Sequence, residues 1–224
     1  MTQPTEPARN SRRGVYAAGL AGAVAAVAAL YVIGGPNGNI TGGQSCSAAL
    51  ASAAAAKPFA KGEVAAFLPA EAPLELTALA FKDPEGKDVT LADFKDRTVL
   101  LNLWATWCAP CRKEMPALDA LQADMGGEDF EVVAVNLDRG GPEKPQAFLD
   151  EIGVGNLALY QDSSNGVLKA LRKVARATGL PTTILIGPEG CEIGTMYGPA
   201  EWHSGEAKAL LEGALAPSRA KPGA

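Results

Sequence analysis

The sequence predicts an α/β fold in which helices cover both faces of a central mixed β-sheet. Three observations support this. Two continuous apolar runs have the length of buried strands, amphipathic stretches alternate with them, and two more strand-like runs flank a tight turn near the C-terminus. The 224 residues, 47% of them hydrophobic and 20% charged, provide one core and an appendage. The net charge of −5 argues against nucleic acid as a partner.

The predicted elements begin with two short strands, Leu74–Phe81 and Asp88–Phe94, on either side of a Pro-Glu-Gly turn. The apolar run Thr98–Ala105 then has the composition of a strand buried on both faces. The elements after it are expected in this order: helix Ala109–Met125, buried strand Glu131–Asp138, short helix Pro145–Ile152, edge strand Leu157–Asp162, helix Val167–Thr178 with Val167, Leu171, Val174 and Ala175 on one face, hairpin strands Thr182–Ile186 and Glu192–Tyr197, and a last helix from about Glu201 to Leu215. A β-α-β section followed by β-β-α produces a mixed sheet.

An uncharged stretch of 19 residues, Val15–Ile33, precedes these elements. As a helix it is about 28 Å long, close to the hydrocarbon thickness of a bilayer. Several arginines precede it, and the next basic residue after it is Lys57, which predicts a cytoplasmic N-terminus over residues 1–14. The alternatives are a cleaved secretory signal and a buried core helix. We interpret residues 15–33 as a single-pass anchor in the cell inner membrane, with the rest of the chain in the periplasm.

Residues 34–73 are predicted to form a tether and an N-terminal extension. The segment GGPNGNITGGQS has nothing to bury, and the Ala-rich stretch Cys46–Pro73 is expected to hold one or two helical turns. The α/β domain is then expected over residues 74–217, with a polar tail over residues 218–224.

The chemistry of the chain is predicted to lie in the motif Trp107-Cys108-Ala109-Pro110-Cys111, where a buried strand meets a helix. A two-residue gap in the first helical turn brings both sulfurs within disulfide reach, and the helix N-terminus stabilises a thiolate on Cys108. Cys108 is therefore the expected nucleophile, and the shielded Cys111 resolves the mixed disulfide. Pro110 holds the turn. The alternatives are an inert disulfide and half of a zinc site, although zinc would need further ligands.

The segments LLNLWATWCAPC and RKEMPAL resemble the thioredoxin superfamily, and VVAVNLD, GLPTTILIGPEGCEIG and GPAEW resemble its membrane-anchored TlpA-like branch. The resemblance runs from about Cys46 to Ala216, and it implies a thioredoxin fold and thiol–disulfide exchange without a metal or other cofactor. It also implies that Pro181 is the cis-proline that faces the cysteines in this superfamily. The backbone of Leu180 would then offer strand-like hydrogen bonds to an incoming peptide. An ordinary trans proline is the alternative.

One position departs from the pattern of thioredoxins that reduce cytoplasmic targets. These proteins carry an Asp six residues before the first cysteine, where this chain has Asn102. Proton transfer from Cys111 must then use water or another acid. Asp138, at the end of the next strand, is the first candidate and Glu114 a weaker one. A solvated surface charge is the more common role for a carboxylate at either position.

The remaining cysteines are Cys46 and Cys191. The resemblance implies a structural disulfide between them that ties the extension to the hairpin, and a lipid-modified Cys46 is the alternative. The single histidine, His203, is expected to be a surface residue, because Sco-type copper chaperones combine a distal histidine with a three-residue gap between their cysteines. A peroxiredoxin would need a Thr where this chain has Ala105.

The resemblance finally implies a function. The protein would reduce cysteine pairs during assembly of the copper site of cytochrome oxidase, on a copper chaperone or on the copper-binding subunit. Its electrons would come from a membrane thiol-transfer protein. Reduction of apocytochrome c before haem attachment is one alternative, and a copper-binding metallochaperone is another. The expected partners are thus disulfide-containing periplasmic proteins and the membrane, and no nucleic acid.

Overall fold

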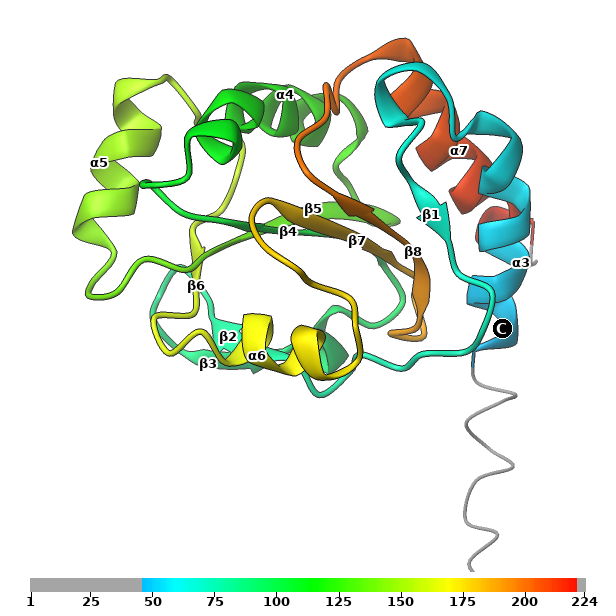
Figure 1. Ribbon diagram of the computed structural model, residues 1–224, viewed down its shortest axis with the longest axis horizontal. Coiled ribbons are helices and arrows are strands. Elements are labelled where there is room, and N and C mark those ends of the chain that lie inside the picture. The colour runs from blue at the N-terminus through cyan, green and yellow to red at the C-terminus, as the bar shows by residue number, and fades with distance from the viewer. Residues whose placement is uncertain (1–45, 221–224) are drawn as a thin grey trace, which may run out of the picture. The chain divides into compact units, whose positions relative to one another are not determined.

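An eight-stranded β-sheet organises residues 46–220, the part of the chain that the structure, a computed structural model, describes (Figure 1). The strand order is β1-β8-β7-β4-β5-β6-β2-β3. The strands are β1 (Leu68–Pro69), β2 (Ala80–Lys82), β3 (Asp88–Thr90), β4 (Thr98–Trp104), β5 (Phe130–Asn136), β6 (Tyr160–Gln161), β7 (Thr182–Ile186) and β8 (Glu192–Tyr197). The helices are α3 (Ser47–Ala56), α4 (Ala109–Met125), α5 (Glu143–Glu151), α6 (Gly166–Lys173) and α7 (Gly205–Arg219), with short 3₁₀ segments η1 (Lys57–Phe59), η2 (Gly62–Val64) and η3 (Leu91–Phe94). Since β4 runs parallel to β5 and antiparallel to β7, the sheet is mixed, as predicted.

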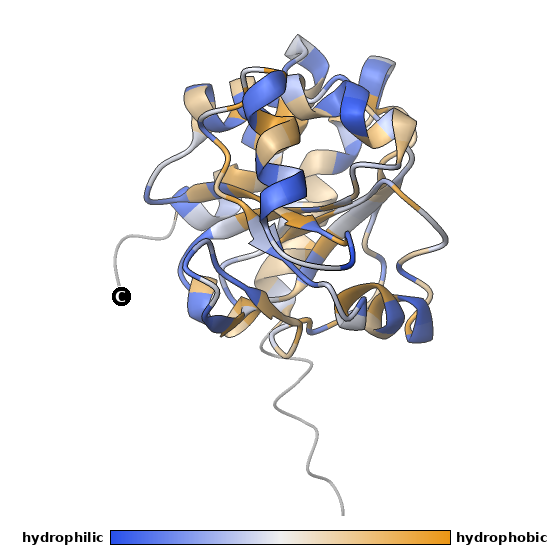
Figure 2. Cartoon of the chain, turned by 90° about the vertical axis from the view of Figure 1, so that its left-hand side faces the viewer, coloured by the Kyte–Doolittle hydropathy of each residue, from blue (hydrophilic) through white to orange (hydrophobic). Residues whose placement is uncertain are grey.

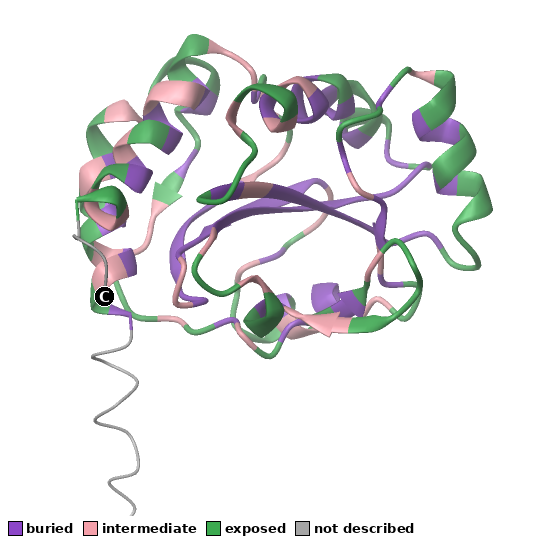
Figure 3. Ribbon diagram, turned by 180° about the vertical axis from the view of Figure 1, so that it is seen from behind, coloured by how far each residue is buried: buried purple, intermediate pink, exposed green. Residues whose placement is uncertain are grey.

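Strand β4 lies inside the sheet, and every one of its residues is buried (Figure 3). Because successive side chains point to opposite faces, Leu100 joins one apolar cluster while Leu101 and Leu103 join another. The first cluster includes residues of α3, α4, α5 and α7, and the second includes residues of α6 and the β2–β3 hairpin. Figure 2 shows apolar residues gathered on the strands and on the helix faces turned toward them. Burial on both faces explains why the uninterrupted apolar run predicts this strand.

The N-terminal extension packs onto the domain from Cys46 onward. Helix α3 lies beside α7 and buries Ala49, Ala53 and Ala56. It has ten residues, more than the one or two turns expected, because this row of alanines is covered by the neighbouring helix. The close approach depends on Gly213 of α7, where a Cβ atom would lie 2.8 Å from a ring carbon of Phe59. Strand β1 pairs with β8 and extends the sheet at that edge.

Two predicted elements in the middle of the chain need correction. The predicted edge strand is not at an edge, since β6 lies between β5 and β2 and the β2–β3 hairpin continues the sheet beyond it. Helix α6 ends at Lys173 instead of Thr178. Ala175 has a left-handed φ of 56°, which a helix does not allow, and Val174 is 41% exposed, so neither belongs to the buried helix face.

The last helix is also displaced from its predicted position. It begins at Gly205, because the hydroxyl oxygen of Ser204 accepts a 3.1 Å hydrogen bond from the Ala207 N–H and caps the helix there. It continues to Arg219 and so includes the first residues of the predicted tail. Helix α4 and strands β7 and β8 have the predicted bounds.

The predicted membrane anchor over residues 15–33 and the tether up to residue 45 lie outside the described residues. Among residues 46–220, no helix combines the length and the apolar character needed to span a bilayer.

Candidate active site

Cys108 and Cys111 form a disulfide at the beginning of α4. Strand β4 carries the chain to its end at Trp104, a short turn follows, and Cys108 is the residue that caps the helix. Their Cα atoms are 5.3 Å apart, and the Cys108 sulfur accepts a 3.3 Å hydrogen bond from the backbone N–H of Cys111. This N–H is one of the donors that a helix start leaves without a partner, so it stabilises negative charge on the Cys108 sulfur.

The two cysteines differ in how far solvent reaches them. Cys108 is 6% exposed and Cys111 is fully buried. The indole of Trp107 beside them is 66% exposed, and Pro110 lies in the first turn of the helix. A disulfide on another protein can therefore approach Cys108 across an apolar ring, while Cys111 is reached only from within the molecule.

The loop before β7 contains the predicted proline, and the Leu180–Pro181 peptide bond is cis, the form that the resemblance implies. Hydrogen bonds fix this loop on both sides of the bond. The Thr182 hydroxyl donates to the Gly179 carbonyl over 2.8 Å, and the Gly198 N–H donates to the Pro181 carbonyl over 3.0 Å. The side chain of Leu180 packs against both apolar clusters.

Asp138 is not the solvated surface charge that is common at the end of a strand. It is 3% exposed, and its carboxylate accepts 2.8 Å hydrogen bonds from both the N–H and the hydroxyl of Thr106. Burial opposes its ionisation, but the hydrogen bonds from Thr106 and Asn136 and the charge of Lys144 prevail, so the pKa of Asp138 lies below its ordinary value. An ionised Asp138 thus holds the turn that leads to Cys108.

Glu114, expected to be a surface charge, is buried as well, at 3% exposure. Its carboxyl group accepts hydrogen bonds from the Asn102 side chain at 2.8 Å, the Ala200 N–H at 3.2 Å and the Trp202 indole at 3.3 Å. Burial raises the pKa of Glu114 to about 7, and these three hydrogen bonds oppose the rise only in part. A carboxyl group that gains and loses a proton near neutrality suits proton transfer.

The spacing of Glu114 from its neighbours in the sequence indicates that it is buried. Residues three positions apart lie on the same side of a helix, so Glu114 shares the buried side of α4 with Cys111 and, through the next turns, with Leu118. A carboxyl group within a buried helix face needs specific partners, and one of them is Asn102, at the position where cytoplasmic thioredoxins have an Asp. Asn102 also donates a 3.0 Å hydrogen bond to the Thr183 hydroxyl, and its own carbonyl oxygen has no partner within residues 46–220.

The second disulfide joins Cys46 to Cys191 across 145 positions, as the resemblance implies. Cys46 is 1% exposed and Cys191 is fully buried. Next to this bond, the Glu189 carboxylate accepts a 2.6 Å hydrogen bond from the Ala49 N–H in the first turn of α3. The disulfide and this helix cap together fasten α3 to the β7–β8 turn.

His203 lies away from the groups described so far. Its Nε2 atom is 3.4 Å from the carboxylate of Asp124, near the C-terminal end of α4, and 3.2 Å from the Lys208 amine. In the described part of the chain, no group of three or more His, Cys, Asp and Glu side chains has the arrangement of a metal site.

Comparison with known proteins agrees with this site. The chain is 38% identical over 111 residues to the thiol-disulfide oxidoreductase ResA of Bacillus subtilis, a match that covers 49% of this chain and 58% of that protein. It is 32% identical over 139 residues to ResA of Bacillus cereus, covering 59% and 70% of the two chains. The chain thus spans little more than half of the first relative's length.

The fold also resembles that of solved thiol–disulfide exchange proteins. A thiol:disulfide interchange protein DsbE from Chlorobium tepidum superposes with a TM-score of 0.54 at 27% identity, over 63% of this chain and 95% of that one. The family model described as the AhpC/TSA family matches residues 72–191, which contain both cysteines of the motif and the cis-proline. With its thioredoxin-like fold, the chain belongs to the AhpC/TSA family.

Proposed function

We propose that the protein is a protein-disulfide reductase that works through the Cys108–Cys111 dithiol. The observation that carries this proposal is the asymmetry of the pair. Cys108 retains 6% exposure at a helix start, and Cys111 is fully buried one turn further along the helix. The names of the relatives, thiol-disulfide oxidoreductase and thiol:disulfide interchange protein, support the same reaction class.

The reaction has two exchange steps. In the reduced protein, the Cys108 thiolate attacks one sulfur of a target disulfide and forms a mixed disulfide, and the other target sulfur leaves as a thiolate. Cys111 then loses its proton and attacks the Cys108 sulfur, which closes the Cys108–Cys111 disulfide and releases the second target thiolate. Two electrons pass to the target, and a second dithiol protein must supply two electrons to restore the reduced form.

The second step requires a base for the Cys111 thiol, and we assign this role to Glu114. It lies one helical turn beyond Cys111, and it is buried on the same side of α4. Asp138 serves a different purpose in this scheme. Its lowered pKa leaves it ionised, and its two bonds to Thr106 position the turn before Cys108.

We further propose that the protein is held in the inner membrane by residues 15–33 and acts in the periplasm on copper-site proteins of cytochrome oxidase, with a membrane thiol-transfer protein as electron donor. The uncharged N-terminal stretch supports the anchor. The Cys46–Cys191 disulfide suits a chain that works outside the cytoplasm. The copper targets rest on the resemblance to the TlpA-like branch.

Two experiments test these proposals. Reduction of insulin should proceed with the wild-type protein and stop with Cys108→Ser, and turnover by that variant would overturn the reductase assignment. A Cys111→Ala variant expressed in membranes should retain its target on Cys108, because the resolving thiol is missing. Recovery of a copper protein supports the proposed target, whereas recovery of apocytochrome c replaces it with the cytochrome c maturation alternative. Stoichiometric, tight Cu(I) binding without disulfide reduction would instead indicate a metallochaperone.

A further inference from the structure

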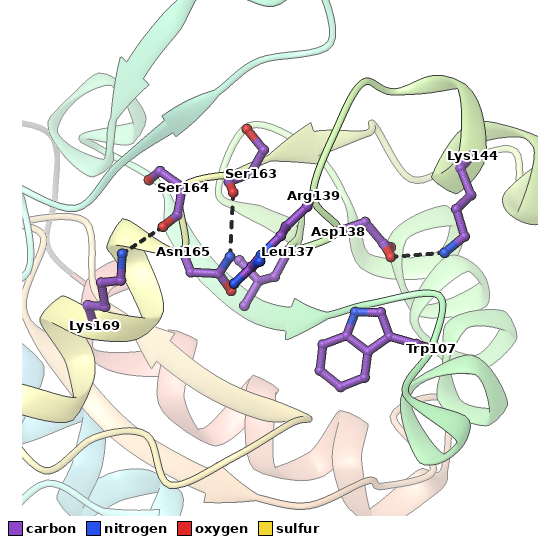
Figure 4. Close-up of a pocket in the computed structure, with 9 residues that line it drawn as sticks. All are labelled: Trp107, Leu137, Asp138, Arg139, Lys144, Ser163, Ser164, Asn165 and Lys169. Carbon is purple, nitrogen blue, oxygen red and sulfur yellow. Dashed lines mark hydrogen bonds and ion pairs between the residues drawn. The ribbon is translucent and has the colours of Figure 1, made fainter.

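A pocket of about 650 Å³ opens beside the exposed indole of Trp107 (Figure 4). It lies between the chain that follows β5, the start of α5, the β6–α6 loop and α6. Its lining includes three cationic side chains, Arg139, Lys144 and Lys169, and we call it the basic pocket. The pocket adjoins the residue that directly precedes Cys108, so a polypeptide joined to Cys108 has it within reach.

Carboxylates in the lining neutralise only part of the positive charge of the basic pocket. Asp138 is the one carboxylate among the described residues that line it. The oxygens of this buried carboxylate already accept hydrogen bonds of 2.8 to 2.9 Å from Thr106 and Asn136, and Lys144 contacts it at 3.4 Å. Three cations and one anion leave the lining with a net charge of +2, in a chain whose total charge is −5.

Within the part of the chain that the structure describes, the other two cations form no ion pair with a carboxylate. Lys169 donates a 2.9 Å hydrogen bond to the Ser164 carbonyl, which carries no net charge, and Arg139 forms no ion pair within residues 46–220. Figure 4 shows that they come from different segments, Arg139 from the chain after β5 and Lys169 from α6. By contrast, Arg97 and Arg176 are paired with Glu131 and Glu192. The pocket therefore presents two cations that an external carboxylate can neutralise.

We propose that the basic pocket binds acidic side chains of the substrate polypeptide close to its target cysteine, and that the protein prefers disulfides flanked by Asp or Glu. This inference rests on the proposed reductase function. Lys and Arg bind carboxylates through charge-assisted hydrogen bonds, and an uncompensated basic surface beside a reactive group also attracts acidic partners over longer distances. Arg112 and Lys113, exposed in the first turns of α4 just after Cys111, extend the positive charge around the cysteines.

The test uses two disulfide-bonded peptides that differ only in Glu or Gln residues beside one cysteine. The reduced wild-type protein should reduce the acidic peptide about tenfold faster at low salt, and added salt should remove most of the difference. In the double variant R139Q/K169Q the ratio of the two rates should fall to nearly one. The matched variant K57Q/K61Q loses the same charge at exposed lysines of the N-terminal extension and should retain the wild-type ratio.

A binding experiment separates this inference from the reductase function. The oxidised protein is titrated with a form of the acidic peptide in which serine replaces both peptide cysteines. Binding is followed by tryptophan fluorescence, to which the exposed Trp107 contributes. Salt-sensitive binding that R139Q/K169Q loses supports the basic pocket even if neither disulfide peptide is reduced, a result that would reject the proposed reductase. Equal reduction of both peptides, with no binding of the serine peptide, overturns the basic pocket and leaves the reductase intact. A rate ratio unchanged in R139Q/K169Q overturns it as well.

Discussion

The side-chain amide of Asn102, on strand β4, donates a 2.8 Å hydrogen bond to the carboxyl group of Glu114, on helix α4. Both side chains are buried, Asn102 fully and Glu114 at 3% exposure. An amide at this position leaves the neighbouring carboxyl group as the one acid of the pair. Relative to a thioredoxin with an Asp at this position of the strand, the carboxyl group therefore lies on α4, the helix that holds Cys111.

Replacing the Glu114 carboxyl group should slow the step that depends on Cys111. Because the pKa of Glu114 is about 7, the rate of mixed-disulfide resolution in the wild type should change with pH around neutrality. In Glu114→Gln this dependence should disappear, and the rate should fall on the order of 10²-fold. Stopped-flow Trp fluorescence with a small disulfide substrate measures the step. An exposed carboxylate on α5, changed in Glu151→Gln, serves as the control and should leave the profile unaltered.

Glu114→Gln should also change how the stability of the protein depends on pH, which is measured independently of the kinetics. The pKa of Glu114 is raised in the folded protein, so the unfolded chain releases this proton at lower pH than the folded protein does. The free energy of unfolding of the wild type therefore falls as pH rises from about 4.5 to about 7. Glu114→Gln should lack this loss. Its free energy of unfolding relative to the wild type should therefore increase on the order of 3 kcal/mol between these pH values. Denaturant unfolding at several pH values measures it, and parallel curves would contradict the assignment.

Asp138→Asn tests the turn before Cys108. The variant should remain folded but lose about 1–3 kcal/mol at neutral pH, because one of the Thr106 donors is left without its acceptor, and disulfide exchange should be slower. The pKa of Asp138 is lowered in the folded protein, so its contribution is present above its unfolded pKa and is lost as pH falls below about 4. The two proteins should thus become more alike in acid. Unchanged exchange rates would remove Asp138 from the mechanism, and Asp88→Asn, at an exposed ion pair, provides the comparison.

Gly213→Ala tests the contact between α3 and α7. The added Cβ would lie 2.8 Å from Phe59 and 3.2 Å from the Ala55 carbonyl oxygen, so the two helices must separate, and we expect a loss of about 1–3 kcal/mol. Gly205→Ala adds the same methyl group in the same helix where nothing lies within 4 Å, and it should change stability by less than about 0.5 kcal/mol. Thermal unfolding of both variants measures the difference. Equal melting temperatures would show that the extension is not held by this contact.

The disulfide of the extension should contribute to stability and not to catalysis. Replacing both cysteines in C46A/C191A should cost about 2–5 kcal/mol, since the bond closes a long loop in the unfolded chain. The variant should still reduce insulin, because its reactive pair is intact. Loss of activity in the folded variant, monitored by circular dichroism, would mean that the extension takes part in the reaction.

The sequence was sufficient to predict the core strands and a closely spaced cysteine pair at the start of a helix, and the reasons are local. Strand β4 is apolar along its whole length because both of its faces are buried, and the cysteine pair has a spacing that few other functions use. The position of a strand within the sheet was harder to predict. β6 has two residues, and its place inside the sheet is decided by the β2–β3 hairpin that pairs with it from far away in the sequence.

Glu114, the proposed proton-transfer residue, shows a different limit of local reasoning. A glutamate within a helix is usually solvated, and nothing in the turns around Glu114 reveals its donors. Two of them, Ala200 and Trp202, follow 86 and 88 positions later. The environment that changes this carboxyl group is therefore assembled only in the folded protein.

The burial of the two disulfides has one more consequence. Thiol–disulfide exchange needs an in-line approach of a thiolate to a sulfur atom, so its rate depends on access as well as on redox potential. Cys46 is 1% exposed and Cys191 is fully buried, whereas Cys108 retains 6% exposure beside the exposed Trp107. A thiol donor that reduces the protein is therefore expected to reach the Cys108–Cys111 disulfide and not the Cys46–Cys191 disulfide. The proposed reductase can therefore cycle between its oxidised and reduced forms while the Cys46–Cys191 disulfide stays intact, because packing shields that bond.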